Sequence, residues 1–123
     1  MKPFSTRVHG ILDYTIGILL VLAPVVFDLD TNTAEGRTPI LVGVLSLLYS
    51  LMTDYELGLV RLLPMRLHLM LDLLVSGILF FSPWLFRFNE RIWLPHALLG
   101  VLGMGVALMT DGNRRSVAQP PAS

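Results

Sequence analysis

Four long stretches without a charged side chain constrain this chain more than any other feature. The stretch at residues 38–53 contains sixteen consecutive uncharged residues, and the stretch at 92–110 contains nineteen. The stretches at 14–27 and 73–86 contain fourteen each. Only 15% of the 123 residues are charged, whereas 54% are hydrophobic. A soluble domain of this size distributes charge over the outer surface of every helix. We therefore expect an all-α membrane protein with four transmembrane helices.

The lengths of these stretches set where the helices begin. A helix rises about 1.5 Å per residue, so fourteen residues cover about 21 Å of a hydrocarbon layer that is roughly 30 Å thick. The first and third helices must therefore start upstream, near His9 and His68, which places Asp13 and Asp72 inside the membrane. The expected helices cover, approximately, residues 9–27, 38–53, 67–86 and 92–110.

The chain contains an internal repeat. A shift of 59 residues aligns RVHGILD at 7–13 with RLHLMLD at 66–72, and the tetrapeptide LMTD closes both halves, at 51–54 and 108–111. Each unit is predicted to be a helical hairpin, and an even number of spans per unit makes the two repeats parallel. The expected organisation is an N-terminal segment, a first repeat, a connecting loop, a second repeat and a disordered tail, at residues 1–8, 9–54, 55–65, 66–111 and 112–123.

The basic residues predict the orientation. Six of the nine Lys and Arg residues fall in the N-terminal segment, the central loop and the tail: Lys2, Arg7, Arg61, Arg66, Arg114 and Arg115. Short cytoplasmic loops carry an excess of Lys and Arg. Both termini are therefore predicted to be cytoplasmic.

Several motifs resemble those of the SPW repeat family of small bacterial membrane proteins. They are Ser82-Pro83-Trp84, its counterpart Ala23-Pro24-Val25, HGILDY at 9–14 and TDYELGLVR at 53–61. The resemblance covers the chain up to about Gly112 and implies a bacterial inner-membrane protein with four spans in two repeats. It implies no particular activity. The first repeat lacks both the Ser and the Trp of the motif.

Each repeat places a histidine and an aspartate four residues apart, on one face of its first helix. Two such faces could meet at the bundle axis and form a quasi-symmetric polar layer from His9, Asp13, His68 and Asp72. One hypothesis is structural: these groups satisfy one another and hold the two halves in register. Arg7 and Arg66 would then support the layer, either by reaching lipid phosphates or by pairing with the acids.

Two other hypotheses assign a function to this polar layer: it binds a ligand, or it takes part in the transport of protons, ions or small solutes. Imidazole and carboxylate can bind zinc, and His9 and His68 could equally be the axial ligands of a haem. No cofactor is predicted, but both haem and a divalent metal are compatible with these residues. Asp13 and Asp72 could instead titrate in a proton, ion or small-solute pathway lined by an oligomer.

The remaining features concern helix ends and the membrane interface. Pro24 and Pro83 are predicted to kink or end their helices, and Trp84, Trp93 and His96 to anchor the chain at the headgroup level. The absence of cysteine, of a glycine-rich phosphate loop and of a GxSxG motif excludes the common thiol, nucleotide and esterase sites. A net charge of zero argues against nucleic-acid binding. The expected protein is a non-enzymatic membrane module that contacts the bilayer and its anionic headgroups and could form a homo-oligomer.

Overall fold

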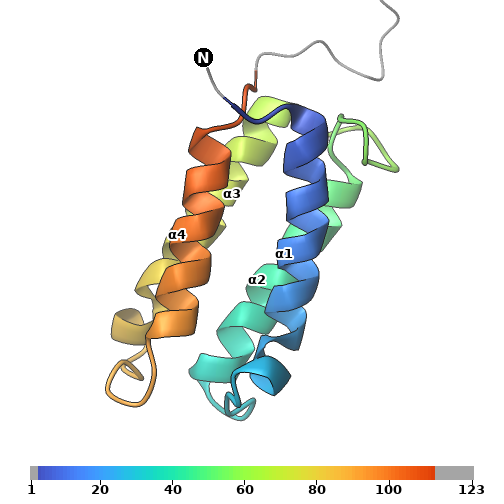
Figure 1. The fold of residues 1–123 in the computed structure, drawn as a ribbon. Coiled ribbons are helices and arrows are strands. Elements are labelled where there is room, and N and C mark those ends of the chain that lie inside the picture. The colour runs from blue at the N-terminus through green and yellow to red at the C-terminus, as the bar shows by residue number, and fades with distance from the viewer. Residues whose placement is uncertain (1–2, 113–123) are drawn as a thin grey trace, which may run out of the picture.

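The computed structural model describes residues 3–112, which form a bundle of four antiparallel helices (Figure 1). The helices are α1 (Thr6–Val26), α2 (Ala34–Leu51), α3 (Met65–Leu85) and α4 (Leu94–Leu108). The start of α1, the loop between α2 and α3 and the end of α4 share one end of the bundle. Except for Gly112, the tail predicted to be disordered lies outside the described residues.

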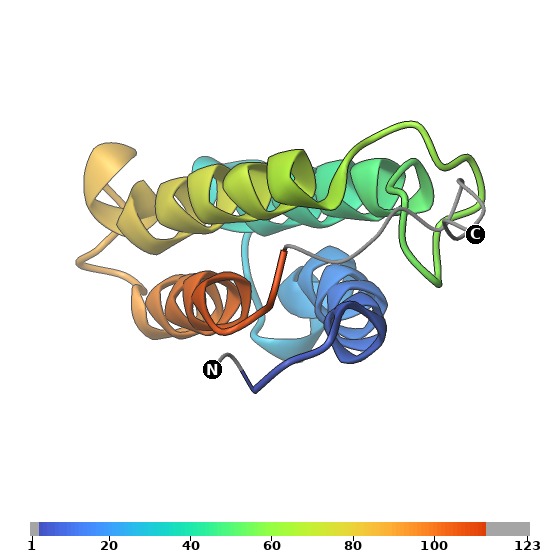
Figure 2. The same ribbon diagram turned by 90° about the horizontal axis from the view of Figure 1, so that it is seen from above.

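The bundle is built from two hairpins, α1 with α2 and α3 with α4, within which the helices make their closest contacts. A glycine in the second helix of each hairpin permits this approach. A Cβ atom on Gly43 would lie 2.8 Å from the Gly17 carbonyl oxygen, and one on Gly100 would lie 2.7 Å from the Phe80 Cα atom. Contacts between α2 and α3 join the hairpins along one side, while α1 and α4 form the other side (Figure 2).

Two helices are long and apolar enough to cross a membrane: α1 and α3, each of 21 residues. The interior of the bundle is also apolar and centres on Leu20, Leu79 and Leu99. Large hydrophobic side chains nevertheless stay exposed along the outer faces, such as Leu41 at 68% and Met70 at 65%. A soluble monomer rarely leaves so much apolar surface in water. The exposed faces therefore suit a lipid environment.

The second and fourth helices differ in extent from the uncharged stretches that predicted them. α2 begins at Ala34, four residues before the stretch at 38–53, because the Glu35 carboxylate finds partners in the Asp30 N–H and the Arg91 guanidinium. α4 has 15 residues, about 22 Å, and ends at Leu108. Beyond the helix the chain pairs with the segment before α1: the Phe4 N–H donates to the Met109 carbonyl at 3.0 Å, and the Asp111 N–H donates to the Phe4 carbonyl at 3.2 Å.

α1 and α3 end in the same way, just after Pro24 and Pro83. In α1 the Leu29 N–H donates to the Pro24 carbonyl at 2.9 Å, and in α3 the Phe88 N–H donates to the Pro83 carbonyl at 2.8 Å. A hydrogen bond from an N–H to the carbonyl five residues earlier is a common way for a helix to end. The residue just before the donor then adopts left-handed backbone angles. The residues between, Asp28 and Arg87, have φ angles of 54° and 62°. The two prolines therefore stand in the last turn, and the repeats share one helix terminator.

The serine of the Ser-Pro-Trp motif compensates for the proline that follows it. Pro83 has no N–H to donate to the carbonyl four residues earlier, which belongs to Leu79. The Ser82 hydroxyl donates to this carbonyl at 2.7 Å and is fully buried. At the corresponding position of the first repeat Ala23 has no hydroxyl to play this part.

We expect Ser82→Ala to lower the free energy of unfolding by about 1 to 2 kcal/mol, because it leaves a buried carbonyl without a donor. Thermal unfolding in detergent measures the change. Thr15→Ala is the control, since the Thr15 hydroxyl also donates one turn back, at 2.8 Å, but to the Ile11 carbonyl, which no proline deprives of its helical N–H. Equal losses in the two variants would contradict this role for Ser82.

Candidate functional site

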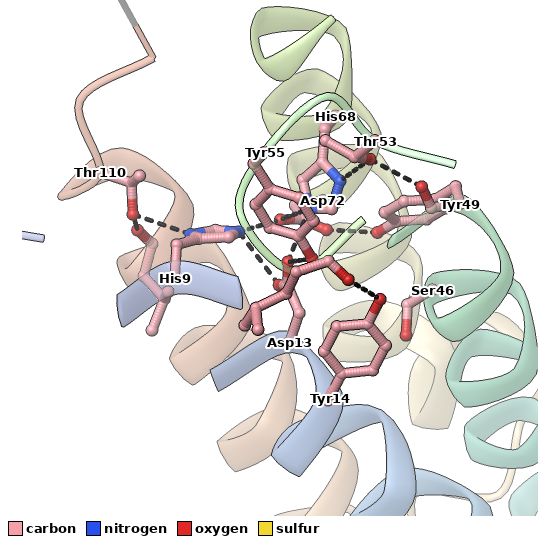
Figure 3. Close-up of polar contacts among 12 residues, drawn as sticks. His9, Asp13, Tyr14, Ser46, Tyr49, Thr53, Tyr55, His68, Asp72 and Thr110 are labelled. Carbon is pink, nitrogen blue, oxygen red and sulfur yellow. Dashed lines mark hydrogen bonds and ion pairs between the residues drawn. The ribbon is translucent and has the colours of Figure 1, made fainter. Parts of the chain in front are cut away.

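Four side chains from the two repeats meet inside the bundle, at the end where α1 begins and α4 ends (Figure 3). We name them the His–Asp cluster: His9 and Asp13 on α1, His68 and Asp72 on α3. Each imidazole contacts both carboxylates through its Nε2 atom. The His9 Nε2 atom lies 3.0 Å from Asp13 and 2.7 Å from Asp72. The His68 Nε2 atom lies 2.8 Å from Asp13 and 3.1 Å from Asp72.

The cluster is almost completely removed from solvent. The His9 and His68 side chains are 1% and 0% exposed, and those of Asp13 and Asp72 are 11% and 10% exposed. Polar groups at such positions are costly unless they find partners inside the protein. The His9 Nε2 atom meets this requirement through a hydrogen bond to Asp72 at 2.7 Å, whereas the His68 Nε2 atom lies against both carboxylates without good hydrogen-bond geometry.

Two threonine hydroxyls fix the orientation of the imidazoles. The His9 Nδ1 atom lies 2.8 Å from the Thr110 hydroxyl, which donates its own hydrogen to the Val106 carbonyl at 2.6 Å. A hydroxyl has one hydrogen, so the Thr110 oxygen must accept the Nδ1–H of His9. The Nδ1 atom of His9 therefore carries a proton, and its Nε2 atom is directed toward the carboxylates.

The second repeat uses the same arrangement. The His68 Nδ1 atom lies 2.6 Å from the Thr53 hydroxyl, which donates to the Tyr49 carbonyl at 2.6 Å. Thr53 and Thr110 are the threonines of the two LMTD segments. The repeat therefore includes the groups that position the imidazoles as well as the imidazoles themselves.

Two tyrosines complete the surroundings of the carboxylates. The Tyr49 hydroxyl donates to Asp72, and the Tyr55 hydroxyl donates to Asp13 at 3.1 Å. Tyr55 lies in the loop between α2 and α3 and is fully buried. Burial first, and then the Asp13 charge, raise the pKa of Tyr55 above its usual value, so its hydroxyl stays a donor.

Two hydrogen bonds fix the position of the segment that carries Tyr55 beside the cluster. The Tyr14 hydroxyl donates to the Leu57 carbonyl at 2.8 Å, and the Thr6 hydroxyl donates to the Glu56 carboxylate at 2.8 Å. On its other side the cluster borders a small cavity of about 40 Å³, lined at the cluster by Tyr49 and farther along by Ser76. This volume has room for water.

The other residues singled out from the sequence lie away from the cluster. Arg7 and Arg66 are exposed on the outer surface. Trp84 and Trp93 are half exposed near the opposite end of the bundle, with ring centroids 6.1 Å apart. His96 lies at that end too, but inside the bundle, where its Nε2–H donates to the Glu35 carbonyl at 2.7 Å. Its 1% exposure is that of an interior side chain rather than a surface anchor.

Sequence reasoning missed Tyr49, Thr53, Tyr55 and Thr110 as members of this site. A signal was present for the threonines, because the LMTD segment recurs in both halves. For the tyrosines the sequence offered no comparable signal, since neither Tyr49 nor Tyr55 has a tyrosine at the equivalent place of the second repeat.

A model of the SPW repeat domain matches residues 7–110. The chain belongs to the SPW repeat family. The matched range contains both repeats, apart from Asp111 at the end of the second, and the whole His–Asp cluster. Family membership and the two long apolar helices together indicate a small membrane protein. Neither a search of curated proteins nor a search of solved structures found a match.

We expect Tyr49→Phe to destabilise the protein by about 1.5 to 3 kcal/mol, because it removes a buried hydrogen bond to a carboxylate. The change is measured by thermal unfolding in detergent. Tyr14→Phe is the matched control: it removes a hydroxyl that donates to a backbone carbonyl at a partly exposed position. If both variants unfold at the temperature of the unmodified protein, the Tyr49 hydroxyl does not support the cluster.

Proposed function

We propose that this SPW repeat protein is a non-enzymatic module of the bacterial inner membrane, whose His–Asp cluster locks its two hairpins together. The main observation is that each histidine lies closer to the aspartate of the other repeat than to the aspartate of its own repeat. The His9 Nε2 atom lies closer to Asp72 of the other repeat than to Asp13 of its own, 2.7 Å against 3.0 Å. The His68 Nε2 atom is likewise closer to Asp13 than to Asp72, 2.8 Å against 3.1 Å.

The position of the cluster gives these contacts their importance. Extensive packing holds the helices of each hairpin together, whereas α1 and α3 lie diagonally opposite in the bundle and touch little. In a membrane, apolar surface does not drive helices together as it does in water, so close packing and polar contacts between helices determine the arrangement. Four charged or polar side chains that meet at the bundle axis fix the distance and the register of α1 and α3.

A second contact joins the repeats at the opposite end. The Arg91 Nε atom of the second repeat donates to the Glu35 carboxylate of the first at 2.7 Å, and the His96 imidazole donates to the Glu35 carbonyl. Glu35 is buried, whereas the Arg91 side chain is 58% exposed. The two hairpins are thus held at both ends, and the more deeply buried contact is the cluster.

The proposal includes four spans with both termini and the cluster toward the cytoplasm. The basic residues of the N-terminal segment, the loop between α2 and α3 and the tail support this orientation. The same residues suit anionic headgroups as partners. Transport by an oligomer stays a prediction, and the cavity beside the cluster is the feature that a proton path would use first.

A double-mutant cycle tests the lock. We expect His9→Gln and Asp72→Asn to show a coupling free energy of about 1 to 3 kcal/mol in thermal or denaturant unfolding, because the two side chains are in contact across the repeats. The control cycle uses Glu35→Gln and Arg91→Gln, which also joins the repeats but through an exposed guanidinium, and we expect a smaller coupling there because solvent screens the pair. Additive effects of His9→Gln and Asp72→Asn would contradict the lock.

Labelling of single cysteines tests the orientation, and the chain has no cysteine of its own. Glu90→Cys lies in the loop between α3 and α4, and Arg61→Cys in the loop between α2 and α3; both positions are exposed. We expect a membrane-impermeant maleimide to label Glu90→Cys in intact spheroplasts, and Arg61→Cys only after the membrane is permeabilised. The opposite pattern, or labelling of both in intact spheroplasts, would contradict the proposed orientation.

A further inference from the structure

The His–Asp cluster has the composition and size of a metal site. It offers two imidazole nitrogens and two carboxylate oxygens, and these four ligand atoms all lie within 4.8 Å of one another. They come from two helices that the rest of the fold holds in place, α1 and α3. A ligand set of two nitrogens and two oxygens on rigid elements suits a four-coordinate ion.

One atom of the cluster has no satisfactory partner among the described residues. The His68 Nε2 atom is fully buried, and although it lies 2.8 Å from Asp13 and 3.1 Å from Asp72, it makes no hydrogen bond of acceptable geometry. A buried nitrogen without a partner is expensive. Because this nitrogen faces the centre of the cluster, an ion bound there would satisfy it.

The threonines give the imidazoles the orientation that metal ligation requires. A histidine that binds a metal through one ring nitrogen usually donates its other N–H to a neighbouring acceptor, which fixes the tautomer. Thr110 and Thr53 accept the Nδ1–H of His9 and His68 and leave both Nε2 atoms directed inward.

The chemistry of the ligands favours zinc among divalent ions. Zinc binds imidazole nitrogen at about 2.0 to 2.1 Å and carboxylate oxygen at about 2.0 to 2.2 Å, so ligands in a tetrahedron stand about 3.3 to 3.5 Å apart. The four contacts in the cluster span 2.7 to 3.1 Å. No two of the four ligand atoms are more than 4.8 Å apart, so an ion would be accommodated if the short contacts lengthened by a few tenths of an ångström and the widest pairs closed in around it. Two imidazoles disfavour calcium and magnesium, which prefer oxygen ligands.

Haem fits the arrangement less well than a metal ion. The His9 and His68 rings meet edge to face with centroids 5.3 Å apart, and both carboxylates lie against their Nε2 atoms. A porphyrin would need a flat space between the two nitrogens, and the carboxylates stand there instead.

We propose that His9, Asp13, His68 and Asp72 bind one divalent transition-metal ion, with Zn²⁺ the preferred ion and the two carboxylates balancing its charge. Thr53 and Thr110 are positioning residues for this site. The metal site goes beyond the structural lock, which operates through direct contacts and needs no ion. The two can fail separately, because coupling between His9 and Asp72 is measured in the presence of a chelator and ion binding is measured after its removal.

The test uses the full chain, purified in a mild detergent and freed of metal with a chelator. Zinc chloride is then added, the free ion is removed, and the retained zinc is measured by native mass spectrometry. Co²⁺ is the spectroscopic substitute, because a tetrahedral site gives it far stronger visible absorption than an octahedral one. We expect one retained zinc per chain and the tetrahedral Co²⁺ spectrum.

Variants assign the binding to the cluster. His9→Ala with His68→Ala should abolish both signals, whereas His96→Gln, which alters the buried histidine at the other end of the bundle, should leave them unchanged. Since the double variant could fail to fold, Thr53→Val with Thr110→Val provides a milder test. It leaves all four ligands in place and should weaken zinc binding about 10- to 100-fold, and Thr53→Ser with Thr110→Ser should restore it.

Three results would overturn the proposal. The first is an unmodified chain that retains no zinc although it is folded. The second is zinc retention that the loss of His9 and His68 does not change, which would indicate adventitious surface binding. The third is an octahedral Co²⁺ spectrum, which would indicate an ion held by water and carboxylates alone.

Discussion

Two aspartates inside the bundle, Asp72 buried and Asp13 nearly so, are the constraint on which the arrangement of the bundle depends. A carboxylate at this depth must find partners within the protein, because neither lipid nor an apolar core can supply them. Each aspartate is met by both histidines and by one tyrosine, so partners converge on the pair from α1, α2, α3 and the loop between α2 and α3. The same contacts bring the two halves of the chain together.

The repeat explains why so short a chain can build this site. Duplication of one helical hairpin supplies a second histidine, a second aspartate and a second threonine in equivalent positions, and a twofold arrangement directs them to one axis. The two halves differ at positions where one half has a hydrogen-bond donor that the other half lacks. Tyr49 and Tyr55 occur only in the first half, whereas Ser82, which serves a carbonyl freed by proline, occurs only in the second.

The sequence predicted the all-helical fold and the two long apolar helices, because uncharged runs and a 59-residue repeat are properties of the sequence itself. It also indicated that the histidines and aspartates could meet, from their spacing of four. It could not indicate their partners. The contact between His9 and Thr110 joins residues 101 positions apart and exists only after four helices have packed. His96 was misleading for a similar reason, since its burial depends on Glu35 from the other hairpin.

The central claim is that threonine hydroxyls accept the Nδ1–H of both cluster histidines, and nitrogen NMR of the histidine-labelled protein tests it most directly. Long-range couplings from the ring protons report which nitrogen carries a hydrogen. We predict a proton on Nδ1 of His9 and of His68, and on Nε2 of His96, which donates to the Glu35 carbonyl and serves as an internal reference. An unprotonated Nδ1 in His9 or His68 would contradict the claim, because the threonine oxygen would then have no hydrogen to accept.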